Sequence, residues 1–125
     1  MKVSKINGQG NHLLLECYGG DLDNLNDKEL LKEILNNLPE EIEMNKISDV
    51  LISDYENGDE SGISGVVLLA ESHISIHTYP LKKFAVADVF SCKEFNVEKV
   101  VNILKEKFKF EKINNRLVVR EYEKN

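Results

Sequence analysis

Apolar positions along this chain follow two different periods, and each period predicts one kind of secondary structure. Short runs of apolar and β-branched residues, bounded by glycine, proline or asparagine, are typical of strands. Longer segments in which leucine, isoleucine and valine return every three or four residues are typical of helices with one apolar face. The strands are expected at residues 12–18, 46–53, 63–70, 74–79, 84–90 and 116–122, and the helices at 26–38 and 96–108.

The expected helix ends carry their own sequence signals. Asn26 followed three positions later by Glu29 has the form of a capping box, and Pro39 is expected to end that helix. Asn96 is a suitable N-cap for the second helix. Both helices are therefore bounded as well as amphipathic.

Strands outnumber helices in the order β-α-β-β-β-β-α-β, which predicts an α+β fold. We expect a two-layer sandwich, a mainly antiparallel sheet with two helices packed on one face. The length of 125 residues favours one domain over residues 1–125. The other face of the sheet stays bare, and apolar residues alternate along its central strands, so we expect a homodimer.

Composition narrows the classes of partner and location. The formal net charge of −6 argues against binding nucleic acid, which relies on clustered lysine and arginine. The longest apolar stretch, residues 66–70, is too short to span a membrane, and no signal-peptide run is present, so a cytoplasmic protein is expected. Cys17 and Cys92 are interpreted as free thiols in that compartment.

Residues 71–80 hold the candidate chemistry. Strand alternation puts Ser75 and His77 on one face of the expected strand and its isoleucines on the other. By itself the segment also fits a polar turn followed by a strand with an ordinary surface or core histidine. The sequence has no catalytic-serine elbow, phosphate-binding loop or metal-binding pattern, so no metal site is expected.

Several segments together decide between these interpretations. They read Gly-Ile-Ser-Gly-Val-Val at 62–67, Glu-Ser-His-Ile-Ser-Ile-His-Thr-Tyr-Pro at 71–80 and Asp-Val-Phe-Ser-Cys at 88–92. Together with the opening segment 10–19, which is similar to the first strand of that family, this set resembles the short, prokaryotic-type S-adenosylmethionine decarboxylase proenzyme family. A pattern in several parts with matching spacing is more specific than any single short motif.

The resemblance implies that the chain cuts itself between Glu71 and Ser72 into chains 1–71 and 72–125. Ser72 then becomes a covalent pyruvoyl group, the cofactor of the family. The resemblance further assigns His77 as the proton acceptor in processing, and Ser64 as support for the cyclic intermediate.

The implied activity is the decarboxylation of S-adenosylmethionine, which supplies the aminopropyl donor for spermidine. In the family the pyruvoyl carbonyl forms a Schiff base with the substrate and serves as the electron sink. The cysteine at the position of Cys92 then donates a proton to the substrate carbon. Cys17 has no such counterpart and is interpreted as a core residue.

Two departures from the family pattern leave the substrate open. Many members carry a His-Arg-Phe-like stretch where this chain has Glu56-Asn57-Gly58, and a tryptophan where it has Tyr79. A pyruvoyl-dependent arginine or ornithine decarboxylase therefore remains the first alternative. A regulatory paralogue that does not cleave is the second, and the presence of all the processing residues argues against it.

Overall fold

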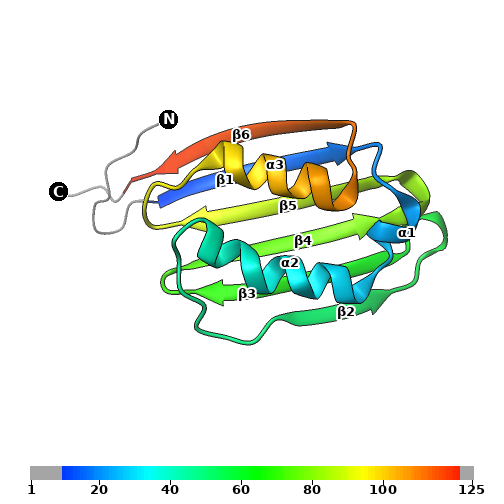
Figure 1. The fold of residues 1–125 in the computed structure, drawn as a ribbon, viewed down its shortest axis with the longest axis horizontal. Helices are drawn as coiled ribbons and strands as arrows, with labels where there is room; N and C mark the ends of the chain where they lie inside the picture. Colours follow the sequence, from blue (N-terminus) through cyan, green and yellow to red (C-terminus); the bar gives the residue numbers. More distant parts are fainter. Residues whose placement is uncertain (1–9, 122–125) are drawn as a thin grey trace.

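The computed structural model describes residues 10–121 as a six-stranded sheet with helices on one side (Figure 1). The strand order is β2-β3-β4-β5-β1-β6, and every neighbouring pair is antiparallel. The predicted α+β sandwich is confirmed. The strands are β1 (Gly10–Tyr18), β2 (Leu51–Tyr55), β3 (Gly62–Leu69), β4 (Ser72–Tyr79), β5 (Phe84–Ser91) and β6 (Lys112–Arg120). The helices are α1 (Leu22–Leu25), α2 (Lys28–Glu41) and α3 (Val97–Phe108), and the 3-10 turns are η1 (Gly58–Glu60) and η2 (Pro80–Lys82).

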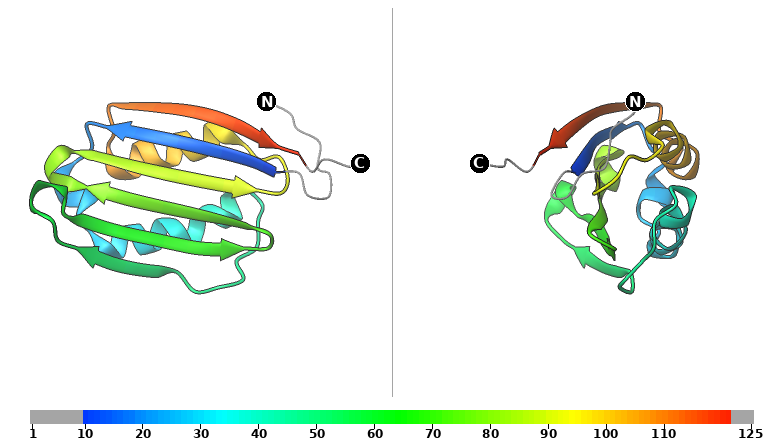
Figure 2. Two further views of the ribbon diagram at one scale, coloured as in Figure 1. Left: turned by 180° about the vertical axis from the view of Figure 1, so that it is seen from behind. Right: turned by 90° about the vertical axis from the view of Figure 1, so that its left-hand side faces the viewer.

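Alternation along the strands divides the sheet into a covered face and an open face. The side chains of Val67, Ile74 and Val89 face the helices and are fully buried. Helices α2 and α3 bury their apolar stripes against this face (Figure 2). At Gly65 a Cβ atom would lie 2.5 Å from Leu35 Cδ1, so the absence of a side chain lets α2 approach β3 closely. The open face carries no helix in the described part of the chain (Figure 2).

The first helical segment differs from the prediction at both ends. The side chain of Asp27, not Asn26, caps α2 by accepting a hydrogen bond from Leu30 N at 3.1 Å. Asn26 instead ends α1, a one-turn helix that the periodicity missed because four residues are too few to show it. Helix α2 continues past Pro39 to Glu41. A proline lacks an N–H donor and crowds the carbonyl four residues back, and the helix continues only two residues beyond it.

Strand β2 is also displaced from the predicted range 46–53. Lys46 makes an isolated bridge with Leu69, but the continuous ladder starts only at Leu51 opposite Val66. The segment 46–51 is longer than its partner segment, and the hydroxyl of Ser48 replaces a main-chain acceptor for Leu68 N. A side chain therefore breaks the ladder where the apolar pattern predicted continuous pairing.

Strand β6 begins at Lys112, four residues before the predicted start at Arg116. Its first residues are largely exposed and polar, so hydrophobic alternation gave no signal. They are ordered by main-chain pairing with β1, beginning at Tyr18 opposite Lys112. The predicted end at residue 122 lies outside the described residues.

Candidate active site

Ser72 is the first residue of β4, directly after the two-residue turn between β3 and β4. Ala70 and Glu71 form this turn, and both are exposed. Glu71 has φ +63°, in the left-handed region that L side chains enter at a cost of roughly 1–2 kcal/mol. The Glu71–Ser72 peptide bond therefore lies at an exposed, strained hairpin tip.

Ser72 lies beside Cys92. Its side chain is on the covered face, the residue is 7% exposed, and Oγ accepts a hydrogen bond from Cys92 N at 3.1 Å. Cys92 follows the last residue of β5 and is partly exposed. The hairpin of β4 and the end of β5 thus bring two of the predicted site residues together.

A second pair forms on the open face. Ser64 of β3 lies opposite His77 of β4 in the ladder, and Ser64 Oγ shares a hydrogen bond with His77 Nδ1 at 2.7 Å. The imidazole is exposed, so its second nitrogen is free to act on a group outside this pair. A hydroxyl on one ring nitrogen fixes the orientation of the ring.

The two pairs do not meet within one chain. His77 is five residues beyond Ser72 on β4, a separation of about 17 Å at the usual rise per strand residue. An odd separation also puts the side chains on opposite faces of the sheet. Ser72 shares its face with Ile74, whereas His77 shares its face with Ser75. The structure brings Ser72 to Cys92 and Ser64 to His77, and it separates His77 from Ser72.

Sequence reasoning left one polar cluster of the open face unassigned. His12 Nε2 lies 3.0 Å from Asp88 Oδ1, and the ring of Phe90 contacts both His12 and His73. Arg120 lies over the same ring, with Cζ 4.9 Å from its centroid. The alternation of side chains along each strand was the signal that could have grouped these residues on one face. It does not predict which residues of neighbouring strands lie opposite each other, because that depends on register.

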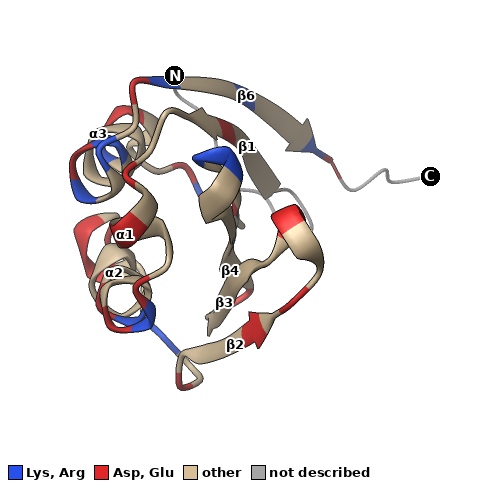
Figure 3. Cartoon of the chain, turned by 90° about the vertical axis from the view of Figure 1, so that its right-hand side faces the viewer, with Lys and Arg blue, Asp and Glu red and all other residues tan. Residues whose placement is uncertain are grey.

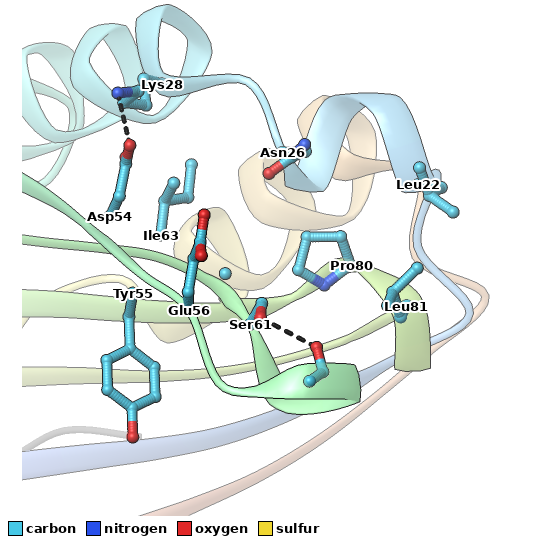
Figure 4. A pocket seen from close by; sticks show the side chains of 12 residues that line it. Leu22, Asn26, Lys28, Asp54, Tyr55, Glu56, Ser61, Ile63, Pro80 and Leu81 are labelled. Carbon is cyan, nitrogen blue, oxygen red and sulfur yellow. Dashed lines mark hydrogen bonds and ion pairs between the residues drawn. The ribbon is translucent and has the colours of Figure 1, made fainter.

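A hollow of about 470 Å³ opens at the other end of the sheet (Figure 4). It contains the stretch that departs from the family pattern, including Glu56 and Gly58. Asp54 at its wall is neutralised by Lys28 at 2.8 Å, and Tyr55 beside it is 58% exposed. Aspartate and glutamate residues occur on α1, α2 and β2 around this end (Figure 3). Within residues 10–121 no three His, Cys, Asp or Glu side chains converge on a metal site.

Comparison with known proteins decides the family. The profile of the S-adenosylmethionine decarboxylase family matches residues 11–121. The chain belongs to this family. A curated S-adenosylmethionine decarboxylase proenzyme of Archaeoglobus fulgidus is 34% identical over 101 residues, 80% of this chain and 87% of that protein. Its counterpart in Acetivibrio thermocellus is 36% identical over 105 residues, 83% of this chain and 82% of that protein.

A solved structure supports the same family. The adenosylmethionine decarboxylase of Aquifex aeolicus superposes with a TM-score of 0.75 at 28% identity, covering 94% of this chain and 98% of that chain. Membership of the S-adenosylmethionine decarboxylase family confirms the resemblance inferred from the motifs. The helices described between residues 10 and 121 are all too short or too polar to cross a membrane.

The two cysteines of this family member are expected to differ in reactivity. Cys17 is buried in the core, and desolvation, with a smaller contribution from Glu16, raises its pKa to about 12. Only the thiolate reacts with alkylating reagents. We therefore expect iodoacetamide at pH 8 to label Cys92 and to leave Cys17 unmodified in the folded protein, as read by peptide mass spectrometry. Unfolding in guanidinium should expose both; equal labelling in the native protein would contradict this assignment.

Proposed function

We propose that this chain is a proenzyme that cleaves itself between Glu71 and Ser72 and then decarboxylates S-adenosylmethionine. The observation that carries the proposal is the contact of Ser72 with Cys92 at a strained hairpin tip, in a chain of this family. The relatives named above are proenzymes of this activity. We place the protein in the cytoplasm, since both of its cysteines are free thiols.

Processing needs only groups of the protein and one water. Ser72 Oγ attacks the carbonyl carbon of Glu71, the C–N bond breaks, and the amine of residue 72 takes the proton, leaving an ester. A base then removes the α-proton of residue 72, and Glu71 leaves as a carboxylate that keeps the Oγ atom. The remaining enamine becomes an imine, and water converts it to the pyruvoyl carbonyl with release of ammonia.

The residues around position 72 fit a pyruvoyl group. The main-chain N–H of Cys92 is a donor beside the side chain of residue 72, and the thiol of Cys92 belongs to the same turn. The group supplies a carbonyl that binds the substrate amine and withdraws the electrons released as carbon dioxide leaves. Cys92 would then give the substrate carbon its proton.

A complete site needs a second copy of the chain. His77 is the assigned base for the α-proton, but it lies about 17 Å from Ser72 on the other face of the same sheet. The open face that carries His77 also exposes large apolar side chains, including Leu68 at 50% and Val118 at 48%. We infer a homodimer in which the open faces meet and the His77–Ser64 pair of one chain reaches the main-chain α-proton of residue 72 of the other, beside the exposed hairpin turn.

Cleavage is expected to leave the fold intact. The first chain would contain β1, β2 and β3, and the second β4, β5 and β6, yet β1 lies between β5 and β6 in the sheet. Denaturing electrophoresis should therefore show two fragments, 1–71 and 72–125, whereas the native protein should elute from a sizing column as one species. Fragments that separate under native conditions would contradict this interleaved arrangement.

The substrate is tested by measuring labelled carbon dioxide released from carboxyl-labelled S-adenosylmethionine, arginine and ornithine. We expect release from S-adenosylmethionine alone, in line with the relatives, and none from the uncleaved Ser72→Ala control. Release from arginine or ornithine would show instead that the acidic stretch at Glu56 has changed the specificity. A parent protein that never cleaves would refute the enzymatic proposal altogether.

A further inference from the structure

Three polar side chains lie buried side by side at the end of the covered face where Ser72 is found. In the ladder between β1 and β5, Ser91 lies opposite Asn11. The ladder between β4 and β5 ends with the pair His73 and Phe90, and the same register continued by one residue puts Ser91 next to Ser72. Ser91 is 0% exposed. Serine is mostly found exposed in folded proteins, so a fully buried serine hydroxyl needs an explanation.

The hydroxyl of Ser91 closes a turn around Cys92. Ser91 Oγ donates a hydrogen bond to Lys93 O at 2.6 Å and accepts one from Lys93 N at 3.0 Å. Both main-chain groups of the residue after Cys92 are therefore tied to the residue before it. These two hydrogen bonds between Ser91 and Lys93 form a clamp that encloses Cys92.

The clamp orients Cys92 toward residue 72. The N–H of Cys92 lies beyond the β5 ladder and donates to the Ser72 hydroxyl instead of a main-chain carbonyl. The following residues have no regular structure until Asn96 caps α3 by accepting from Lys99 N. Without the Ser91 hydroxyl, the turn that carries Cys92 and directs its N–H would lose two hydrogen bonds.

We propose that Ser91 is a positioning residue whose buried hydroxyl holds the turn that carries Cys92, so that the main-chain N–H of Cys92 stays against residue 72. This inference rests on the proposed function and adds a residue to it. Ser91 touches neither the scissile bond nor the substrate carbon, and it acts through Cys92.

Processing changes the set of hydrogen bonds that fix the position of Cys92. In the proenzyme the Ser72 hydroxyl and the Ser91 clamp both fix the position of Cys92. The Ser72 oxygen leaves with Glu71 during cleavage, so in the mature enzyme the clamp acts without that partner. Loss of the Ser91 hydroxyl should therefore impair turnover more than cleavage.

The test compares Ser91→Ala with the pair Ser91→Thr and Ser91→Val, which have nearly the same shape and differ in the hydroxyl. Ser48→Ala is the control, because Ser48 Oγ likewise donates to one main-chain oxygen and accepts from one main-chain N–H, away from Cys92. Cleavage is followed on denaturing gels and turnover by carbon dioxide release. Mass spectrometry of the 72–125 fragment after turnover gives the fraction that begins with alanine instead of the pyruvoyl group. The rate of Cys92 alkylation is measured separately in an uncleavable Ser72→Ala background.

Ser91→Ala and Ser91→Val should lower turnover about 10-fold, the effect of losing a buried hydrogen bond. They should also raise the alanine fraction per turnover and change the alkylation rate of Cys92 several-fold. Ser91→Thr and Ser48→Ala should stay near the parent in all three. The alanine fraction counts only molecules that react, so lower stability alone does not move it.

An unchanged alanine fraction and alkylation rate in folded Ser91→Ala, or in Ser91→Val should the alanine variant not fold, would overturn the proposal. A defect in Ser91→Thr as large as that in Ser91→Val would also overturn it, because the hydroxyl would then not be the cause. Failure of the parent to cleave or to release carbon dioxide refutes the proposed function instead, so the two failures are distinguishable.

Discussion

Co-expression of a Ser72→Ala chain with a His77→Ala chain is expected to restore cleavage of the His77→Ala chain, although neither variant cleaves alone. The first variant lacks the nucleophile and keeps the base, and the second lacks the base and keeps the nucleophile. Because His77 and Ser72 are too far apart within one chain, the base has to come from the partner. Cleavage should rise from near zero to a substantial fraction of the His77→Ala chains, measured by intact-mass spectrometry.

One control comes from the mixture itself and two from further samples. The Ser72→Ala chain should stay intact, and a Ser72→Ala, His77→Ala double variant should fail to rescue. Alone, the His77→Ala chain should stop at the ester, which hydroxylamine splits at position 72 while ordinary peptide bonds remain. No rescue in a confirmed mixed dimer would contradict the exchange of His77 between chains, and normal cleavage of His77→Ala alone would remove His77 from processing.

Loss of the thiol at position 92 is expected to separate cleavage from turnover. Cys92→Ala should still cleave appreciably, since the attacking hydroxyl and the assigned base are unchanged. Its turnover should fall about 10²–10⁴-fold, the range typical for loss of a general acid. Carbon dioxide release per cleaved chain is the measurement, and alanine in place of pyruvate on the 72–125 fragment should increase because the proton goes to the wrong carbon.

Cys17→Ala is the matched control for this loss of a thiol. Cys17 is buried in the core opposite Ala85, at the other end of the β1–β5 ladder from Ser91, so turnover per cleaved chain should stay at the parent value. A Cys92→Ala enzyme that turns over like the parent would return Cys92 to the role of an ordinary partly buried thiol.

Most of the fold was readable from the sequence because its strands follow simple alternation. The cores of β3, β4 and β5 were predicted within a residue or two, as was α3 with its Asn96 cap. The errors occur where main-chain pairing or a side chain, not burial, sets the structure. Strand β6 begins among exposed residues paired to β1, and β2 starts late because Ser48 replaces a ladder acceptor.

The candidate site was predictable in its members but not in its arrangement. The motif identified Ser64, Ser72, His77 and Cys92, and their assigned roles stay predictions. Strand parity alone would have put Ser72 with Ile74 and away from His77, so this part of the geometry was available before the structure. The contact between Ser72 and Cys92 was not, because it joins residues of two strands through a turn held by Ser91.

The sequence by itself determined the family and the alternation that builds the sheet, and it predicts the bond at which the chain is expected to cleave. These depend on residue identity and on local periodicity, which the chain carries without reference to distant contacts. The tertiary structure alone decided which polar groups meet: Cys92 with Ser72, and His12 with Asp88. These contacts depend on strand order and register. Strand β1 lies between β5 and β6 through long-range pairing that no local pattern encodes.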